Sequence, residues 1–231
     1  ASNGDGGGMV GSGTVTNCIF TGNTASNGDG GGMVGSGTVT NCTFTGNTAT
    51  GGGGGVFSSS YNSIAVTNST FTGNTATGGG GLCVTMDSSG TVTNCIFTGN
   101  TATDGDGGGV WVDGSVTVTN CTFDGNMATQ GDSGGMLGGT AINCIFWGNT
   151  ASSNNEVNCN VRYSCIQSGY PGTGNISKDP LFVNPPTNLR LQSTSPCIDK
   201  GTPTDAPTTD IVGTVRPQGA GFDMGAYEYV E

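Results

Sequence analysis

Apolar and polar residues alternate in short runs along the first 150 residues, and the alternation returns at a nearly fixed period. The block Val-Thr-Asn-Cys-Ile-Phe-Thr-Gly-Asn-Thr occupies residues 15–24, and related blocks occupy residues 39–48, 66–75, 92–101 and 118–127. An altered copy occupies residues 141–150. Six copies indicate a repeat protein, in which neighbouring units stack their apolar residues into one continuous core.

The repeat favours strands over helices. One position of the six copies is filled by Cys18, Cys42, Ser69, Cys95, Cys121 and Cys144, at spacings of 24, 27, 26, 26 and 23 residues. Segments rich in Thr, Val and Phe and punctuated by Gly suit short strands and disfavour helices. Three short strands per unit at this period predict an all-β fold, a right-handed parallel β-helix (solenoid) with about six regular coils in residues 1–150.

Alternation along the strands predicts which side chains face the core. We expect Val15, Cys18 and Phe20 to point inward, and Thr16 and Ile19 to point outward. The same inward position predicts a stack of six rings, Phe20, Phe44, Phe71, Phe97, Phe123 and Phe146. Asparagine tolerates a bent backbone, and its amide can bond to the Asn above and below. Two structural ladders are therefore predicted, one of Asn17, Asn41, Asn68, Asn94, Asn120 and Asn143, and one of Asn23, Asn47, Asn74, Asn100, Asn126 and Asn149.

The pattern changes after residue 150, where Gly and Pro become irregular. We interpret residues 151–231 as the final coil or coils followed by a C-terminal capping module, because a solenoid has to cover its open apolar end. At the other end, Ala1 corresponds to Ala25, which lies inside a repeat, so we expect an upstream segment.

Charge is strongly one-sided, with 16 acidic residues, 5 basic residues and no His, for a net charge of −11. The first 161 residues contain no Lys or Arg. Nucleic acid is therefore disfavoured as a partner, whereas divalent cations are natural counter-ions. No run of apolar residues is long enough to span a membrane.

Acidic residues recur in the Gly-rich turns that precede the first strand of a unit. They occupy one position in units one, two, five and six, where units three and four have Gly. Hard oxygen ligands in such turns suit Ca²⁺. We therefore predict calcium as a cofactor, while solvated turn residues remain the alternative. The predicted ligands are Asn3, Asp5, Asn27, Asp29, Asp104, Asp106 and Asp132.

The nine cysteines fit an extracellular setting, although their number is odd. At the repeat position, parallel side-chain vectors match disulfide geometry poorly, so stacked free thiols are favoured over cross-links there.

Enzymatic function is disfavoured by the residues that are missing. A lyase that removes a proton next to a uronate needs an Arg or Lys base, and the six coils contain neither. Outward Phe57, Trp111 and Trp147 suit stacking on sugars or on a neighbouring protein. Outward Thr-x-Thr pairs, such as Thr14 and Thr16, resemble in part the flat threonine face of ice-binding solenoids.

Two stretches resemble known families. The repeats, with Gly-Gly turns followed by Phe-x-x-Asn, resemble those of chlamydial polymorphic outer membrane proteins. The tail, with Tyr-Ser-Cys-Ile-Gln (163–167), Asp-Pro-Leu-Phe-Val (179–183), Ser-Pro-Cys-Ile-Asp (195–199) and Asp-Met-Gly-Ala-Tyr-Glu-Tyr (223–229), resembles the C-terminal half of secreted bacterial β-helix proteins of the choice-of-anchor Q type. These resemblances imply a β-helix on a bacterial surface or outside the cell. They do not imply an enzymatic activity, because these families are mostly known by their architecture. Cys165 and Cys197 lie in two of the tail motifs, and we predict that they form a disulfide, with two buried thiols as the alternative.

The sequence thus predicts a non-enzymatic extracellular structural or surface protein: a rigid spacer, an adhesin or a fibre subunit. Head-to-tail self-association into filaments is expected, because an uncovered stack presents open strand edges. A surface that binds glycans, other cell-surface components or ice is the alternative.

Overall fold

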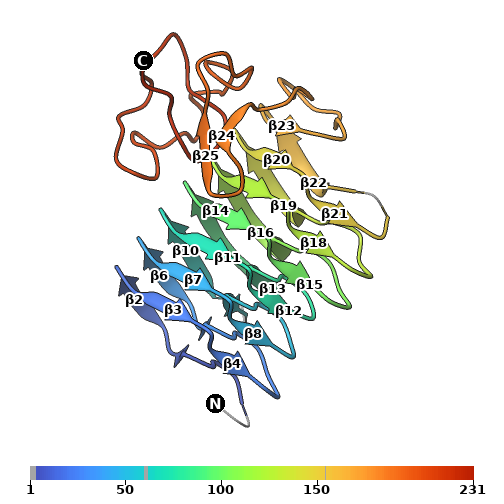
Figure 1. Ribbon diagram of the computed structural model, residues 1–231. Coiled ribbons are helices and arrows are strands. Elements are labelled where there is room, and N and C mark those ends of the chain that lie inside the picture. The colour runs from blue at the N-terminus through green and yellow to red at the C-terminus, as the bar shows by residue number, and fades with distance from the viewer. Residues whose placement is uncertain (1–3, 60–61, 154) are drawn as a thin grey trace.

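The computed structural model describes residues 4–59, 62–153 and 155–231, and it has the predicted parallel β-helix fold (Figure 1). Three parallel sheets run the length of the solenoid, and the described residues contain no helix. It follows that these residues also contain no helix that could cross a membrane.

The ten strands of the first sheet, sheet A, are β1 (Met9–Val10), β2 (Gly13–Thr16), β5 (Met33–Val34), β6 (Gly37–Thr40), β9 (Val56–Ser58), β10 (Ser63–Thr67), β13 (Leu82–Thr93), β16 (Val110–Thr119), β19 (Met136–Ile142) and β22 (Val157–Arg162). Sheet B contains β3 (Ile19–Thr21), β7 (Thr43–Thr45), β11 (Thr70–Thr72), β14 (Ile96–Thr98), β17 (Thr122–Asp124), β20 (Ile145–Trp147) and β23 (Cys165–Ile166). Sheet C contains β4 (Thr24–Ala25), β8 (Thr48–Ala49), β12 (Thr75–Ala76), β15 (Thr101–Ala102), β18 (Met127–Ala128) and β21 (Thr150–Ala151). Below, coil 1 ends at β4, and coils 2 to 6 end at the later strands of sheet C in order.

Each strand pairs in parallel with its counterpart in the next repeat, so equivalent residues lie directly above one another. Val15 pairs with Val39, and Phe20 pairs with Phe44. The six phenylalanines form the predicted stack, with ring centroids 4.6 to 4.8 Å apart and interplanar angles of 2° to 14°. The inward valines, cysteines and phenylalanines build one continuous hydrophobic core.

Stacked cysteines occupy the corner between sheets A and B. The Cys95 thiol donates a hydrogen bond to the carbonyl oxygen of Thr93, two residues earlier, at 3.2 Å, and Cys42, Cys121 and Cys144 make the equivalent bond. Ser69 makes the same bond at 2.9 Å to Thr67, which explains why Ser replaces Cys in coil 3. These cysteines are free thiols.

The two asparagine ladders differ in structure. The side chains of Asn47, Asn74, Asn100, Asn126 and Asn149 are buried. From Asn23 to Asn126, each side-chain amide donates to the amide oxygen of the asparagine in the next coil, at 2.8 to 2.9 Å. The Asn17 series instead forms the bend between sheets A and B, in the left-handed conformation, with φ from 48° to 54°. Asparagine is one of the few residues that adopts this conformation readily. Direct amide bonds in this series join Asn94 to Asn68 and Asn143 to Asn120.

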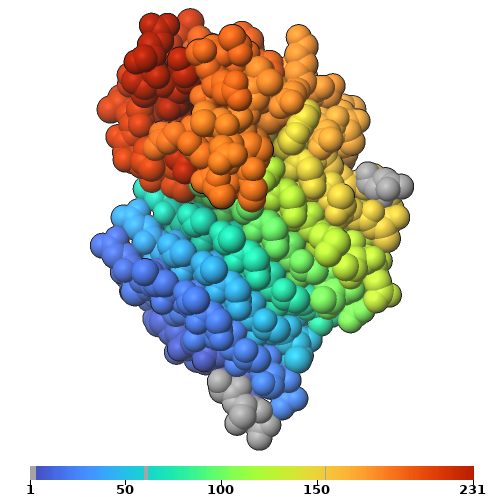
Figure 2. Space-filling view, viewed as in Figure 1, coloured from blue at the N-terminus to red at the C-terminus, as the bar shows by residue number. Residues whose placement is uncertain are grey.

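The end of the stack beyond coil 6 is covered by the turn that follows β23. Tyr170 packs against the main core there, and Asn175 donates to the carbonyl oxygen of Val161 at 3.1 Å. Residues 178–231, which we call the C-terminal module, lie on the side of the solenoid instead, over the later strands of sheet B (Figures 1 and 2). They include one antiparallel pair, β24 (Phe182–Asn184) and β25 (Asn188–Leu191). The capping expected of residues 151–231 is therefore performed by their first third, and the remainder covers a lateral face.

Candidate functional site

The outer face of sheet B is covered along half of its length. One outward column, two residues after the bend asparagine in each coil, contains Ile19, Thr43, Thr70, Ile96, Thr122 and Ile145. Ile19 is 77% exposed, whereas Ile96 is 8% and Ile145 1% exposed. Ile96 and Ile145 point outward as predicted, but they are buried in a second hydrophobic cluster formed with the C-terminal module. Sequence periodicity could not anticipate this, because the covering chain is outside the repeat.

Bend asparagines hold the C-terminal module through its main chain. The amide of Asn94 donates to the carbonyl oxygen of Thr209 at 2.7 Å, and the amide of Asn120 donates to that of Asp223 at 2.9 Å. Asn143 makes a two-way contact with the backbone of Thr202, with both distances 2.8 Å. These three asparagines are buried, so the series predicted as a ladder is also a docking surface in coils 4 to 6.

A buried charged network stabilises the C-terminal module. Arg216 and Glu228 form an ion pair at 2.7 Å, with side chains 0% and 1% exposed. The Arg216 guanidinium also donates to the carbonyl oxygens of Asp223 and Gly225, which lie in the segment that contacts sheet B. Burial raises the pKa of Asp223 to about 6, although hydrogen bonds from the backbone N–H groups of Tyr229 and Asp199 partly oppose this shift. The Asp-Met-Gly-Ala-Tyr-Glu motif and the isolated Arg216 were the sequence signals for this network, and they did not reveal the pairing.

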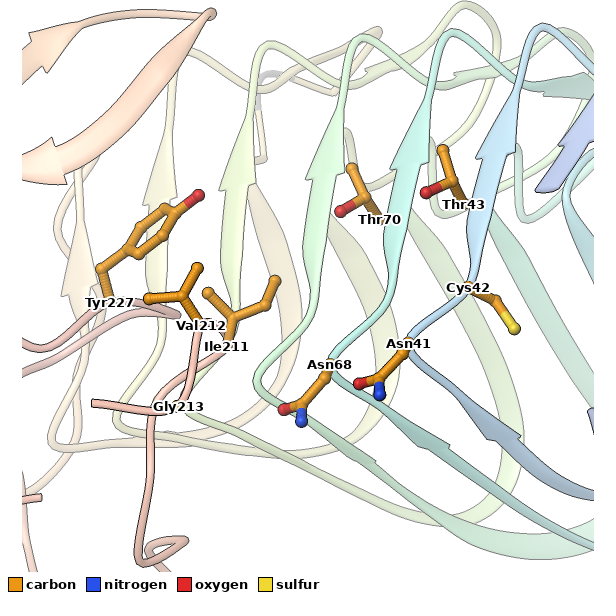
Figure 3. Close-up of a pocket in the computed structure, with 9 residues that line it drawn as sticks. All are labelled: Asn41, Cys42, Thr43, Asn68, Thr70, Ile211, Val212, Gly213 and Tyr227. Carbon is orange, nitrogen blue, oxygen red and sulfur yellow. The ribbon is translucent and has the colours of Figure 1, made fainter. Parts of the chain in front are cut away.

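A groove lies along the edge of the C-terminal module, between the module and the uncovered strands of sheet B (Figure 3). Its volume is about 510 Å³. Polar side chains from coils 2 and 3 form one side, and largely apolar residues of the C-terminal module form the other. The lining residues are Asn41, Cys42, Thr43, Asn68 and Thr70 from the solenoid, and Ile211, Val212, Gly213 and Tyr227 from the C-terminal module.

The Tyr227 ring also borders a second hollow of about 430 Å³, which Thr70 and Leu189 line with it. The guanidinium of Arg190 lies 4.6 Å from the centre of the ring, a cation–π contact that fixes its position. Partial burial raises the pKa of Tyr227, although Arg190 opposes the shift, so the phenol stays neutral and can donate a hydrogen bond. The groove thus combines neutral hydrogen-bonding groups with an apolar wall.

A second surface feature is an outward apolar stripe on sheet A. Strand registry aligns Val10, Val34, Phe57, Cys83, Trp111 and Leu137 in six successive coils. Cys83, in the coil between those of Phe57 and Trp111, is fully buried, and the other five are at least partly exposed. The rings of Phe57 and Trp111 lie over glycines: a Cβ on Gly52 would lie 3.1 Å from the Phe57 ring, and one on Gly78 would lie 2.7 Å from the Trp111 ring. Glycine at these two positions, where other coils have Asp, is therefore required by the rings. Trp147 lies elsewhere, against the C-terminal module.

Three of the predicted calcium ligands, Asp5, Asp29 and Asp106, accept hydrogen bonds from the backbone of the next coil. Asp5 accepts a hydrogen bond from the backbone N–H of Asp29 at 3.0 Å, and Asp106 accepts one from that of Asp132 at 2.6 Å. Asp29 accepts from Gly52 at 2.5 Å, and desolvation raises the pKa of Asp29 more than this bond lowers it.

In coils 5 and 6, Asp104 accepts from the Gln130 amide at 2.5 Å. Asn3 lies outside the described residues, and nothing specific to calcium is seen at Asn27. Across the described chain, no three acidic, His or Cys side chains converge as a metal ligand set. Calcium binding stays a prediction, and a melting temperature unchanged by chelation would refute it.

Cys165 and Cys197 are brought together, but they are free thiols in the structure. Both are buried in the cluster beneath the C-terminal module, and the Cys165 thiol donates to the carbonyl oxygen of Lys178 at 3.1 Å. Their interaction raises the pKa of Cys197, and burial adds to the shift. The structure therefore differs from the predicted disulfide and agrees with the alternative of two buried thiols. A cross-linked peptide in a non-reduced digest would establish the bond under oxidising conditions.

The remaining sequence predictions concern surfaces. The outward threonines of sheet A are in register, Thr14 with Thr38 and Thr16 with Thr40, and ice binding by this face stays a prediction. Head-to-tail association also stays a prediction. Among the described residues, the strands of coil 1 pair on one side only, whereas Tyr170 covers the opposite end of the stack.

Comparison with known proteins agrees with this architecture. A family model described as a right handed beta helix region matches residues 8–177, which include all six coils and the turn that covers the stack. The search of curated proteins and the search of solved structures gave no match. The matched region is more than two thirds of the sequence, and it ends where the C-terminal module begins. The chain belongs to the right-handed β-helix family.

Proposed function

We propose that this protein is a non-enzymatic structural component of a bacterial cell surface or of the extracellular space, where it acts as a rigid spacer. The β-helix fold is compatible with a structural or surface protein. The observation that supports the proposal is the use of repeated polar groups for contacts between coils. Asparagine amides, cysteine thiols and turn carboxylates each bond to the chain of a neighbouring coil.

The chemistry of the thiols supports the same proposal. Burial raises the pKa of Cys121 well above its ordinary value and that of Cys159 to about 12. Such thiols stay protonated near neutral pH, and a protonated thiol is a poor nucleophile and a poor metal ligand. These groups contribute to packing.

The proposal is tested by two measurements on the purified protein. Amide hydrogen exchange is expected to be slow and uniform through coils 2 to 6, because every coil is bonded to two neighbours. Incubation with pectate, alginate, xylan, chitin and cellulose is expected to release no oligosaccharide. Release of product from any of these polymers, abolished by one point substitution in this chain, would sink the proposal.

A second candidate function, binding of an extended polysaccharide, is favoured by the aromatic stripe. Phe57 and Trp111 are two coils apart, which corresponds to about 9.6 Å at a strand spacing of about 4.8 Å. That separation is close to the length of one disaccharide unit of an extended β-1,4-linked glycan. Both side chains are partly exposed, as stacking on sugars requires.

Retention on insoluble cellulose, chitin and xylan tests this candidate. Trp111→Ala is expected to lower retention about tenfold, the loss of roughly 1.4 kcal/mol expected of one stacking platform. Ile19→Ala, which shortens an exposed apolar side chain outside the stripe, serves as the control. Equal retention of the two variants would rule out the stripe as the binding surface.

A further inference from the structure

The open half of sheet B repeats the chemistry of the half that the C-terminal module covers. The bend asparagines of coils 1 to 3 have the same left-handed backbone as those of coils 4 to 6, and their strands continue in the same register. The difference lies in coverage. Asn17 and Asn41 are exposed and Asn68 is partly exposed, whereas Asn94, Asn120 and Asn143 are buried.

The covered half shows what this surface binds. Its contacts are made by main-chain groups of irregular polypeptide: carbonyl oxygens of Thr209 and Asp223 accept from asparagine amides, and the N–H of Ala226 donates to the Thr122 hydroxyl at 3.0 Å. Gly225 approaches so closely that a Cβ there would lie 2.8 Å from the Ile145 side chain and 2.9 Å from the Thr122 hydroxyl. The surface therefore fits a glycine-containing segment that presents backbone rather than charged side chains.

The groove provides the same elements without such a segment. Asn41 and Asn68 are the next asparagines of the series, and Thr43 and Thr70 occupy the column position of Thr122. Ile211 and Val212, the latter 57% exposed, extend the apolar surface of the C-terminal module along the wall (Figure 3). Of the residues that line the groove, Cys42 and Tyr227 have titratable side chains, and burial raises the pKa of both. The Cys42 thiol is buried in the solenoid core, so the Tyr227 phenol is the titratable group at the groove surface (Figure 3).

We propose that this groove is a docking site for a short, irregular, glycine-containing polypeptide segment of a second chain, bound through its main chain as the chain's own Asp223–Tyr227 segment is bound in coils 5 and 6. The continuity of the groove with that interface favours a polypeptide over a glycan. The occupant would donate to the threonine hydroxyls and accept from the asparagine amides, and its apolar side chains would pack on Ile211, Val212 and Tyr227.

The test uses the full chain and a synthetic peptide with capped ends and the sequence of residues 222–228, Phe-Asp-Met-Gly-Ala-Tyr-Glu. Binding is measured by calorimetry or by chemical-shift changes of the groove residues. The expected result is saturable binding that Asn41→Gly weakens about tenfold or more and Asn17→Gly leaves unchanged. Glycine is chosen because it keeps the left-handed backbone while removing the amide. A peptide with Ala in place of its Gly is expected to bind more weakly, because Gly225 has no room for a Cβ.

Three outcomes would overturn the proposal. The first is no binding of the peptide, and the second is binding to which Asn41→Gly and Asn17→Gly are equally sensitive or insensitive. The third is binding of cello-, xylo- or chito-oligosaccharides that Asn41→Gly abolishes while the peptide does not bind, which would assign the groove to a glycan. Both variants are expected to keep the wild-type melting temperature within a few degrees, since neither side chain is buried, so a loss of binding cannot be attributed to unfolding.

Discussion

Replacement of Asn100 by Ala tests whether the buried asparagine ladder holds the coils together. The Asn100 side chain makes four hydrogen bonds: its oxygen accepts from the backbone and the amide of Asn74, and its amide donates to Phe71 and Asn126. Removing it leaves the Asn74 backbone N–H without this partner and takes one bond from each of the three other groups. At about 1–3 kcal/mol for a stranded buried group and about 1 kcal/mol for each of the three weakened ones, the cost is roughly 4–6 kcal/mol.

Asn23→Ala provides the matched control at the edge of the same ladder. The Asn23 side chain is partly exposed and donates one hydrogen bond, to the Asn47 oxygen at 2.9 Å. Its loss is expected to cost about 1 kcal/mol or less, because water can replace the partner. The two substitutions remove the same atoms, so a difference between them reports the position in the ladder.

Urea unfolding followed by circular dichroism measures both free energies of unfolding, and comparison of the slopes shows whether both variants unfold over the same extent of surface. Hydrogen exchange then locates the effect, which is expected in coils 3 to 5 for Asn100→Ala and in coils 1 and 2 for Asn23→Ala. A cost for Asn100→Ala no larger than that for Asn23→Ala would refute the reasoning, since the ladder would then add nothing to the strand pairing.

Three further predictions concern the core, the C-terminal module and pH. Phe97→Ala removes a ring that stacks on both faces, with centroid distances of 4.7 and 4.8 Å, so it is expected to lower the free energy of unfolding by about 3–5 kcal/mol. Phe20→Ala removes a ring that stacks on one face and is expected to lower it by less, as measured by the same urea unfolding. Glu228→Gln leaves the Arg216 charge buried without its partner, so the C-terminal module is expected to lose roughly 3–5 kcal/mol of stability and to be cleaved first in limited proteolysis. Glu231→Gln, at an exposed residue, is expected to leave the stability and the cleavage pattern unchanged. Burial raises the pKa of Glu156, so the folded state binds this proton more tightly than the unfolded state, and wild-type stability is expected to fall as the pH rises above the ordinary pKa of a glutamate. Glu156→Gln is expected to flatten this decline, and an unchanged pH profile would contradict the reasoning.

Much of the solenoid was predictable because its information is local and repeated. The inward positions of Val15 and Phe20, the stacked rings and the bends at the Asn17 series all follow from alternation and turn chemistry, and the repeat confirms each inference six times. Ser69 in place of Cys was predictable as a small buried group, although the bond to the carbonyl two residues earlier was not.

The surface was less predictable, because it depends on a segment without periodicity. Nothing in the alternation distinguishes Ile19 from Ile96, yet one is exposed and the other is covered by residues more than 80 positions later in the chain. The ion pair of Arg216 with Glu228 and the groove beside Tyr227 are also contacts between irregular segments. The acidic turns drew attention through their charge, whereas the hydrogen bonds that Asp5 and Asp106 accept from the backbone of the next coil were not predicted.

The lateral position of the C-terminal module has a consequence for how such a chain can change in length. The module contacts coils 4 to 6, the last three coils before the chain enters the module. In the outward column of the described coils, the order Ile, Thr, Ile occurs only beneath the module. A whole repeat unit added or deleted at coils 1 and 2 would leave the surface that contacts the module unchanged. The near identity of residues 1–24 and 25–48, which differ only at Ile19 and Thr43, is what duplication of one such unit produces. Because the C-terminal module binds the side of the last three coils, the solenoid can gain or lose whole coils at its N-terminal end without disturbing that contact.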